Sequence, residues 1–230
     1  MPAAPTRRQP EFPAEAWFCR EGSLALVREI QRHAIPELTR VFGHTGLYLR
    51  PCGALPETLS GNMLAQVLSL HRERGRLAGG LACEDAALPI ASGSLSLVYA
   101  LCVLETSEQP EALASELARV LKPGGVALLL SLNPWGLARL RWAFRGLAPV
   151  DPSTLQLWLG RHGLEVERQR WLGPMWRPAP AVDVSSQASG GLFAGLRAGH
   201  LVVARRREPG LTPLRAGAPA LALRPGMSAG

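Results

Sequence analysis

The chain has 230 residues, of which 47% are hydrophobic, and it carries a formal net charge of +7. This length suits one α/β domain with a sizeable core, and no apolar run approaches the roughly 20 residues that a membrane-spanning helix needs. The four cysteines and five histidines are scattered, with no Cys-x-x-Cys pair, which argues against a disulfide framework and against a metal site.

The positive charge is concentrated toward the end of the chain. Residues 205–230 contain five arginines and one glutamate, and Lys122 is the only lysine among the 25 basic residues. We interpret the arginine excess first as a coding bias, so it indicates no specific nucleic-acid partner. A basic tail would still favour weak contact with anionic surfaces. The N-terminus lacks the apolar core of a signal peptide, so we expect a cytoplasmic protein.

The first third of the chain predicts a helix followed by three strands. Residues 1–14 are rich in proline and alanine, so we expect disorder there. An apolar stripe over residues 16–42 predicts a helix that Pro36 breaks or kinks. Short apolar runs then predict strands over residues 46–49, 63–70 and 80–83.

The middle of the chain predicts a strand, a crossover helix and a second strand. Residues 94–104 end in an almost wholly apolar run, which is typical of a strand covered on both faces. Pro110 opens a helix with Lys122 in its last turn, and glycine after Pro123 ends that helix. Residues 126–132 complete the unit, which is right-handed in parallel sheets.

The last third predicts a short helical segment and the closing strands of the sheet. Residues 137–144 combine arginines with aromatic and apolar residues, which suits a wall over a substrate pocket or a membrane or partner surface. Asp151 can cap a helix over residues 152–162. Further along the chain we expect strands at residues 164–171 and 200–204, a candidate flap at residues 173–191, and a disordered tail. The predicted organisation is thus a disordered segment at 1–14, one domain at 15–205 and a disordered basic tail at 206–230.

The middle unit resembles the second half of the class I methyltransferases that use S-adenosylmethionine, in particular their type 11 group. The matching motifs are Asp85-Ala86, Leu88-Pro89, Leu104-Glu105, Leu-Lys-Pro-Gly-Gly at residues 121–125, and Asn133-Pro134-Trp135. The resemblance implies a Rossmann-like α/β fold. Its sheet is mostly parallel and seven-stranded, or abbreviated, with helices on both faces, and here the helix after the first strand is cut short. The cofactor would lie at the carboxyl ends of the first four strands.

The glycine-rich loop that follows the first strand in this family is altered here. Aligned on that strand, Tyr48 takes the acidic position, and the three glycine positions become Arg50, Cys52 and Ala54. Gly53 is the one glycine left and is out of register. The family uses glycine because the backbone must turn sharply close to the methionine part of the cofactor. By resemblance, Arg50, Cys52 and Gly53 are nevertheless the candidate residues of this loop.

The remaining candidates follow the second, third and fourth strands. The resemblance places adenine against Asp85 and Ala86, although a loop acid that caps local amides is the simpler reading of Asp85. It also places Ala100 and Leu101 beside the cofactor. The second strand ends at residues 69–71 without the acid that usually binds the ribose hydroxyls.

The resemblance offers candidates for the acceptor side as well. Asn133 could orient an acceptor through its amide, and Trp135 could cover the methyl group or the substrate. For Glu105 we favour a role as a loop or cap residue over a role as a general base.

Two interpretations of function follow. The first is a methyltransferase that uses S-adenosylmethionine on an unidentified acceptor, mainly by holding it in line with the methyl–sulfur bond. The second is a catalytically inactive relative, a pseudoenzyme that keeps the fold as a binding or interaction module. The altered glycine loop, the missing ribose acid and the shortened first crossover favour the second, whereas Asp85-Ala86 and the Asn133 loop favour a ligand cleft. An adaptor for membranes or nucleic acid is a weaker third option.

Overall fold

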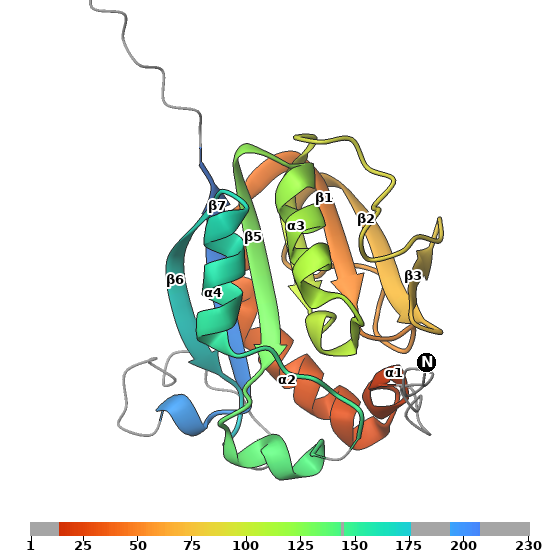
Figure 1. The fold of residues 1–230 in the computed structure, drawn as a ribbon, viewed down its shortest axis with the longest axis vertical. Helices are drawn as coiled ribbons and strands as arrows, with labels where there is room; N and C mark the ends of the chain where they lie inside the picture. The colour runs from red at the N-terminus through yellow and green to blue at the C-terminus, as the bar shows by residue number, and fades with distance from the viewer. Residues whose placement is uncertain (1–13, 144, 176–193, 208–230) are drawn as a thin grey trace, which may run out of the picture.

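The computed structural model describes residues 14–143, 145–175 and 194–207, and its centre is a seven-stranded sheet in the order β3-β2-β1-β4-β5-β7-β6 (Figure 1). Strands β2, β1, β4 and β5 are parallel neighbours, and β3 and β7 run antiparallel to the strands beside them. The strands are β1 (Phe42–Arg50), β2 (Met63–Glu73), β3 (Arg76–Gly79), β4 (Leu95–Leu101), β5 (Leu121–Leu132), β6 (Leu164–Leu172) and β7 (Gly199–Arg206). The predicted α/β fold with a mostly parallel seven-stranded sheet is confirmed.

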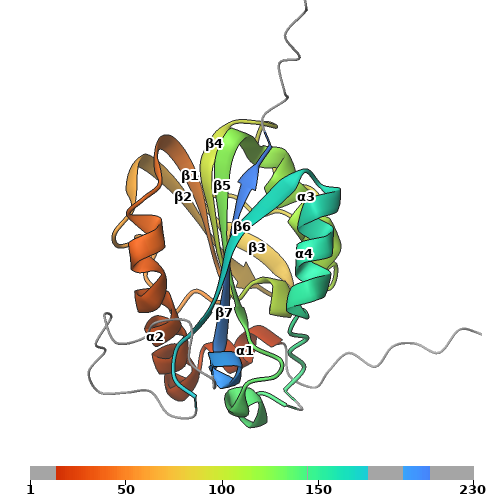
Figure 2. The same cartoon turned by 90° about the vertical axis from the view of Figure 1, so that its left-hand side faces the viewer.

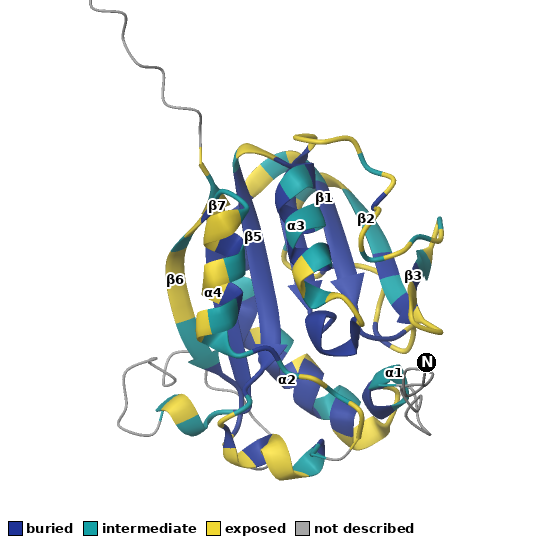
Figure 3. Ribbon diagram, in the orientation of Figure 1, coloured by how far each residue is buried: buried dark blue, intermediate teal, exposed yellow. Residues whose placement is uncertain are grey.

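Helices cover both faces of the sheet, as expected. Figure 2 shows α2 on one face, α3 and α4 on the other, and α1 near the lower end of the sheet. Each face has its own apolar core, and β5, between them, is buried along most of its length (Figure 3). The helices are α1 (Ala14–Phe18), α2 (Glu21–Leu38), α3 (Pro110–Val120) and α4 (Pro152–Arg161), with 3-10 turns η1 (Leu104–Thr106), η2 (Leu137–Arg141) and η3 (Ala194–Leu196).

The β4–α3–β5 unit forms as predicted, with one correction at its turn. All seven residues of β4 are buried, and α3 turns Leu113 and Leu117 into the core. The helix already ends at Val120, so the expectation that Lys122 lies in its last turn was wrong. Instead, Leu121 pairs with Leu95, and the four residues that follow bulge out before regular pairing resumes. The extended backbone of Leu121 therefore begins β5 earlier than the apolar pattern indicated.

The β1–β2–β3 region departs from the regular crossover pattern. Within the described residues 51–62 there are turns but no helix. Strand β2 returns directly as β3 through Arg74 and Gly75, whose φ angles of 51° and 78° are both positive. Such a pair forms the tight turn whose twist matches an antiparallel hairpin. The strand expected at residues 80–83 was wrong, because β3 ends at Gly79 and Cys83 makes only an isolated bridge to Leu77.

Three other expectations changed. The N-terminal helix is split into α1 and α2, and α2 runs through Pro36 for two further residues. The segment at 137–144 contains only the 3-10 turn η2, and residue 144 lies outside the described residues. The candidate flap lies largely in residues 176–193, and the predicted terminal disorder in residues 1–13 and 208–230; these too are outside the described ranges. Among the helices described, none has the length and apolar character needed to cross a membrane.

Candidate functional site

The candidate cofactor residues gather at the carboxyl ends of β1, β2 and β4, where open α/β sheets bind ligands. Arg50 ends β1 and pairs in register with His71 of β2, while Ala100 pairs with the residue before Arg50 and Leu101 ends β4. The tight turn Asp85-Ala86 lies between the bridged residues Glu84 and Ala87. The topology therefore brings the predicted residues to one edge of the sheet.

Arg50 folds back over the loop that replaces the glycine-rich turn. Its side chain is buried, with 1% of its surface exposed, and it donates to the Leu55 carbonyl and, at 3.4 Å, to a Glu57 carboxylate oxygen. The Arg50 guanidinium carbon lies 6.0 Å from the centre of the Tyr48 ring, close enough for a cation–π contact. The side chain thus fills space at the end of β1 that a glycine would leave open.

The two other candidates of this loop are also packed against protein. Cys52 is buried, and burial raises the pKa of its thiol to about 11, so the thiolate is scarce at neutral pH. A Cβ added to Gly53 would lie 3.3 Å from the His71 ring. The backbone at Gly53 therefore lies close to the His71 side chain of β2, with little space for a larger residue at Gly53.

A second buried arginine, Arg72, lies where β2 ends. None of its side chain is exposed, and its Nη1 lies 2.5 Å from Oδ1 of Asp85. Ser107 donates to the other carboxylate oxygen, so both oxygens of Asp85 are engaged. Arg72 also donates to Thr106 Oγ1 at 3.2 Å and to the Val103 carbonyl at 3.4 Å. One guanidinium thereby joins β2, the Asp85 turn and the segment after β4.

Helix α1 covers the same edge from outside (Figure 1). The Glu15 carboxylate accepts the backbone N–H groups of Arg74 at 2.6 Å and Gly75 at 3.2 Å. Trp17 and Phe18 of this helix are buried in the core. Helix α1 is therefore fastened to the β2–β3 turn.

Glu105 is a buried carboxyl group just beyond β4. Full burial raises its pKa to about 7, although a hydrogen bond from the Leu132 N–H acts in the opposite direction. Cys102, between β4 and Glu105, has a φ of 47° and donates its N–H to the Leu130 carbonyl at 2.7 Å. These contacts tie the ends of β4 and β5 together, which matches the interpretation of Glu105 as a local structural group.

Asn133 and Trp135, the candidates for the acceptor side, lie in the loop after β5. The Asn133 amide is fully buried and donates to the Gly195 and Arg197 carbonyls, each at 2.7 Å, and its oxygen accepts the Trp135 N–H. The Trp135 indole is exposed and donates to Asp151 at 3.1 Å. Asn133 therefore holds the loop in place, and contact with an acceptor stays a prediction for both residues.

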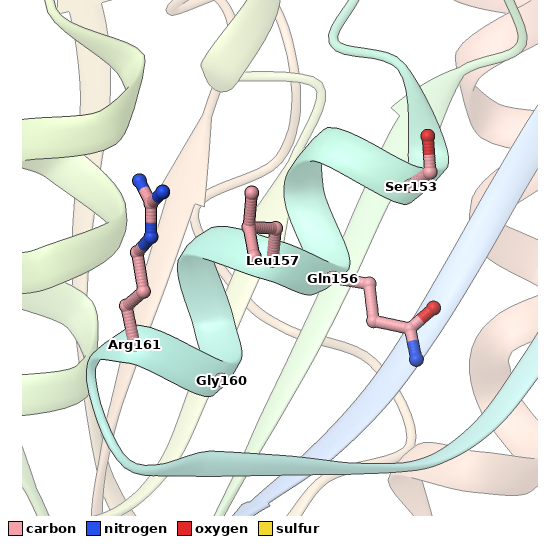
Figure 4. A pocket seen from close by; sticks show the side chains of 5 residues that line it. All are labelled: Ser153, Gln156, Leu157, Gly160 and Arg161. Carbon is pink, nitrogen blue, oxygen red and sulfur yellow. The ribbon is translucent and has the colours of Figure 1, made fainter.

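A shallow hollow elsewhere in the fold has no comparable chemistry. It follows the outer side of α4, and its lining residues, all from that helix, are Ser153, Gln156, Leu157, Gly160 and Arg161 (Figure 4). Because α4 packs beside β6 and α3, this hollow is far along the sheet from β1 and β2. No group of three or more potential metal ligands occurs within the described ranges.

Sequence reasoning missed Arg72 and its partners Thr106 and Ser107. The available signal was the charged run around Arg74-Gly75, which indicates a hairpin turn and so places Arg72 just before the end of β2. The cleft does not fit S-adenosylmethionine as it is folded. Strand β2 runs on to Glu73, so the expectation that this strand ends at residues 69–71 without an acid was wrong. Buried guanidinium groups nevertheless stand at a glycine position, Arg50, and directly before Glu73, at Arg72, and both carboxylate oxygens of Asp85 have partners.

Comparison with known proteins identifies relatives of the central segment. Residues 43–129 match a family model described as a methyltransferase domain. The segment is 35% identical over 103 residues to malonyl-[acyl-carrier protein] O-methyltransferase of Laribacter hongkongensis, covering 42% of this chain and 34% of that protein. It is 32% identical over 111 residues to a biotin biosynthesis bifunctional protein of Cellvibrio japonicus, covering 47% and 22% respectively. The matches thus span about a third or less of these curated relatives.

Solved structures share the fold over most of the chain. A Haloferax volcanii protein solved in complex with a methyltransferase activator has a TM-score of 0.56 at 15% identity, covering 86% of this chain and 97% of that one. A Thermotoga maritima S-adenosylmethionine-dependent methyltransferase has a TM-score of 0.53 at 12% identity, covering 84% and 94%. The comparisons support a relationship to methyltransferases that depend on S-adenosylmethionine, the cofactor that this relationship implies.

Proposed function

We propose that the chain is a divergent relative of the class I methyltransferases that uses this fold as a binding module without the family's cofactor. The observation that carries the proposal is the buried ion pair between Arg72 and Asp85. Asp85, which the resemblance assigns to adenine, instead pairs with the buried side chain of Arg72. Arg50 closes the neighbouring part of the cleft in the same way.

Energetics support this conclusion. A buried ion pair that loses one partner leaves an uncompensated charge, which costs about 3–5 kcal/mol. A ligand that displaced Arg72 from Asp85 would have to offset that cost. Its affinity would fall by about two to four orders of magnitude, because each 1.4 kcal/mol is a factor of ten. A cofactor site with a micromolar dissociation constant would then have one of about 0.1 to 10 mM.

Calorimetric titration with S-adenosylmethionine and its demethylated product tests the proposal. We expect no saturable binding at millimolar ligand. We also expect Arg72→Ala to gain measurable affinity for adenosine, since it removes the group that occupies this part of the cleft. The matched control is Arg76→Ala, because Arg76 lies on the same hairpin but pairs with Glu84 at the surface. Micromolar binding of S-adenosylmethionine by the unaltered chain would contradict the proposal.

A second candidate function is methyl transfer from S-adenosylmethionine after the cleft opens. It is favoured by the family match over residues 43–129 and by the relative from Laribacter hongkongensis, whose name points to an acyl-carrier-protein acceptor. An assay with labelled S-adenosylmethionine and malonyl-acyl carrier protein tests it directly. Transfer of label that Asp85→Ala abolishes would establish this second function and refute the first. A cytoplasmic location remains a prediction under either function.

A further inference from the structure

An exposed apolar surface lies on the segment around η2, independent of the cofactor cleft. Trp135, Leu137 and Leu140 have 67%, 48% and 74% of their surface exposed. They make up three of the seven large hydrophobic side chains that are exposed among the described residues. These three residues, which we call the η2 surface, lie within six positions of one another. Exposed apolar groups gathered in this way mark interaction sites.

Packing fixes the direction in which the η2 surface faces. Ala138 and Trp142 point inward and are buried, and the Trp142 ring lies 5.9 Å from the Trp17 ring in an edge-on contact. Arg141 accepts a hydrogen bond from the Trp17 indole through its carbonyl and donates to the Gly22 carbonyl through its side chain. The inner face of the segment is therefore anchored to α1 and α2, which leaves the apolar outer face exposed.

The charges around this surface are all positive within the segment itself. Residues 133–150 contain three arginines and no acid. Arg139 and Arg145 are exposed and form no ion pair with any residue that the structure describes. The first acid after this segment in the sequence is Asp151, which accepts hydrogen bonds from the Trp135 indole and from Ser153. Both donors are neutral, so Asp151 keeps one negative charge against the three arginines of the segment. The surface thus combines apolar side chains with unneutralised guanidinium groups.

We propose that the η2 surface docks the chain on an anionic lipid bilayer. Leu137 and Leu140 would enter the headgroup boundary, the Trp135 ring would lie at the interface, and Arg139 and Arg145 would contact lipid phosphates. Segment η2 lies at one extreme end of the molecule in both views (Figures 1 and 2). A protruding tip of this composition fits a planar lipid interface, whereas a protein partner would need a matching hollow.

Co-sedimentation of the full chain with vesicles tests the proposal. We expect binding to vesicles of phosphatidylcholine with phosphatidylglycerol, at least tenfold weaker binding to phosphatidylcholine alone, and weakening as salt is raised. Leu140→Glu should reduce binding at least tenfold, and Arg139→Glu should reduce it and flatten the salt dependence. Both side chains are exposed, so neither change should disturb folding.

Phe42→Glu is the matched control, because Phe42 is 73% exposed but lies at the amino end of β1, at the opposite edge of the sheet. It should bind vesicles like the unaltered chain. A loss of binding in Phe42→Glu as large as in Leu140→Glu, or no binding of the unaltered chain to anionic vesicles, would overturn the proposal. Self-association that Leu140→Glu abolishes, without vesicle binding, would identify the surface as a contact between copies and would overturn it as well.

Discussion

The two halves of the sheet are held together by different means. From β4 to β7 the strands are joined by crossover helices and a closing hairpin, and apolar side chains of α3 and α4 cover the face. From β1 to β3 no helix joins the described strands, and buried arginines link the strand ends through Arg50 and Arg72. We call the β4–β7 part the regular half and the β1–β3 part the irregular half. Both halves bury apolar side chains, but only in the irregular half do fully buried arginine side chains link the ends of neighbouring strands.

The family match, over residues 43–129, includes strands of both halves. The half that carries the Leu-Lys-Pro-Gly-Gly turn keeps the layered arrangement. The half in which the resemblance placed the cofactor has no helix in residues 51–62, and the side chains of Arg50 and Arg72 are buried at the ends of its strands. A shared fold therefore does not by itself determine whether a ligand binds.

The largest expected effect comes from removing one partner of the irregular half. Arg72→Ala should lower the free energy of unfolding by about 3–5 kcal/mol, because it leaves Asp85 without its cation. The double variant Arg72→Met, Asp85→Leu should recover most of that loss, since replacing both charges by apolar groups is often neutral. Urea denaturation measures both. A double variant no more stable than the single one would show that the hydrogen bonds of Arg72 to Thr106 and Val103 matter more than the pair.

In the regular half, Leu117→Ala should lower the free energy of unfolding by a comparable amount, about 2–5 kcal/mol, by a different mechanism. Leu117 is fully buried between α3 and the sheet, so truncation leaves a cavity. This loss of stability should be unaffected by salt, because no charge is involved. Denaturation of the Leu117→Ala variant at low and high salt measures it. A salt-dependent loss at Leu117 would remove the proposed distinction between the halves.

The next effect is the pH dependence of the free energy of unfolding that Glu105 causes; this residue follows β4, where the two halves of the sheet meet. Burial raises the pKa of Glu105 to about 7, so the folded chain keeps a proton that the unfolded chain loses above about pH 4.5. The free energy of unfolding should therefore fall by about 3 kcal/mol as the pH rises through this window. Glu105→Gln should remove this fall and be more stable at pH 8, while differing little at pH 4. Equal pH profiles for the two proteins would show that Glu105 is ionised when folded.

A smaller effect is expected at the start of α4. Asp151 accepts the Ser153 N–H at 2.9 Å and the Trp135 indole N–H at 3.1 Å. Asp151→Ala should lower the free energy of unfolding by about 1 kcal/mol, which is the usual loss when an N-cap side chain is removed. Asp151→Asn should keep most of the stability, because its amide oxygen can still accept. Thermal unfolding would detect the difference, and an asparagine variant as unstable as the alanine variant would contradict a capping role.

The smallest expected effect is a difference in the rates at which two cysteines react with a thiol reagent. Cys19 is exposed, whereas Cys52 is buried with a raised pKa. A maleimide reagent should label Cys19 rapidly and Cys52 only when the chain opens. Arg72→Ala should accelerate labelling of Cys52 if the irregular half opens as one unit. Mass spectrometry of labelled peptides would follow both sites, and an unchanged rate at Cys52 would show that the two parts of the cleft open separately.

The sequence predicted the regular half well because each of its signals is local. Pro110 begins α3 and Asp151 caps α4, as the sequence indicated. The irregular half could be predicted only in part. The pattern of apolar residues does not predict that β2 turns back at Arg74. That turn depends on positive φ angles within a run of polar residues. The partners of Arg72 come from segments up to 34 residues away, a pairing that no periodicity encodes.

The close approach of α2 to β7 sets an order for folding. A Cβ on Gly199 would lie 2.9 Å from Ile30, and one on Gly173 would lie 2.8 Å from it, so α2 sits directly against the last strands of the sheet. Helix α2 precedes β7 by about 160 residues in the sequence, whereas β1 and the loop after it, which also contact α2, follow the helix directly. The part of the α2 surface around Ile30 is therefore covered only after β7 has been synthesised. Until then the nascent protein exposes this apolar surface of α2, and exposed apolar surface is what chaperones bind.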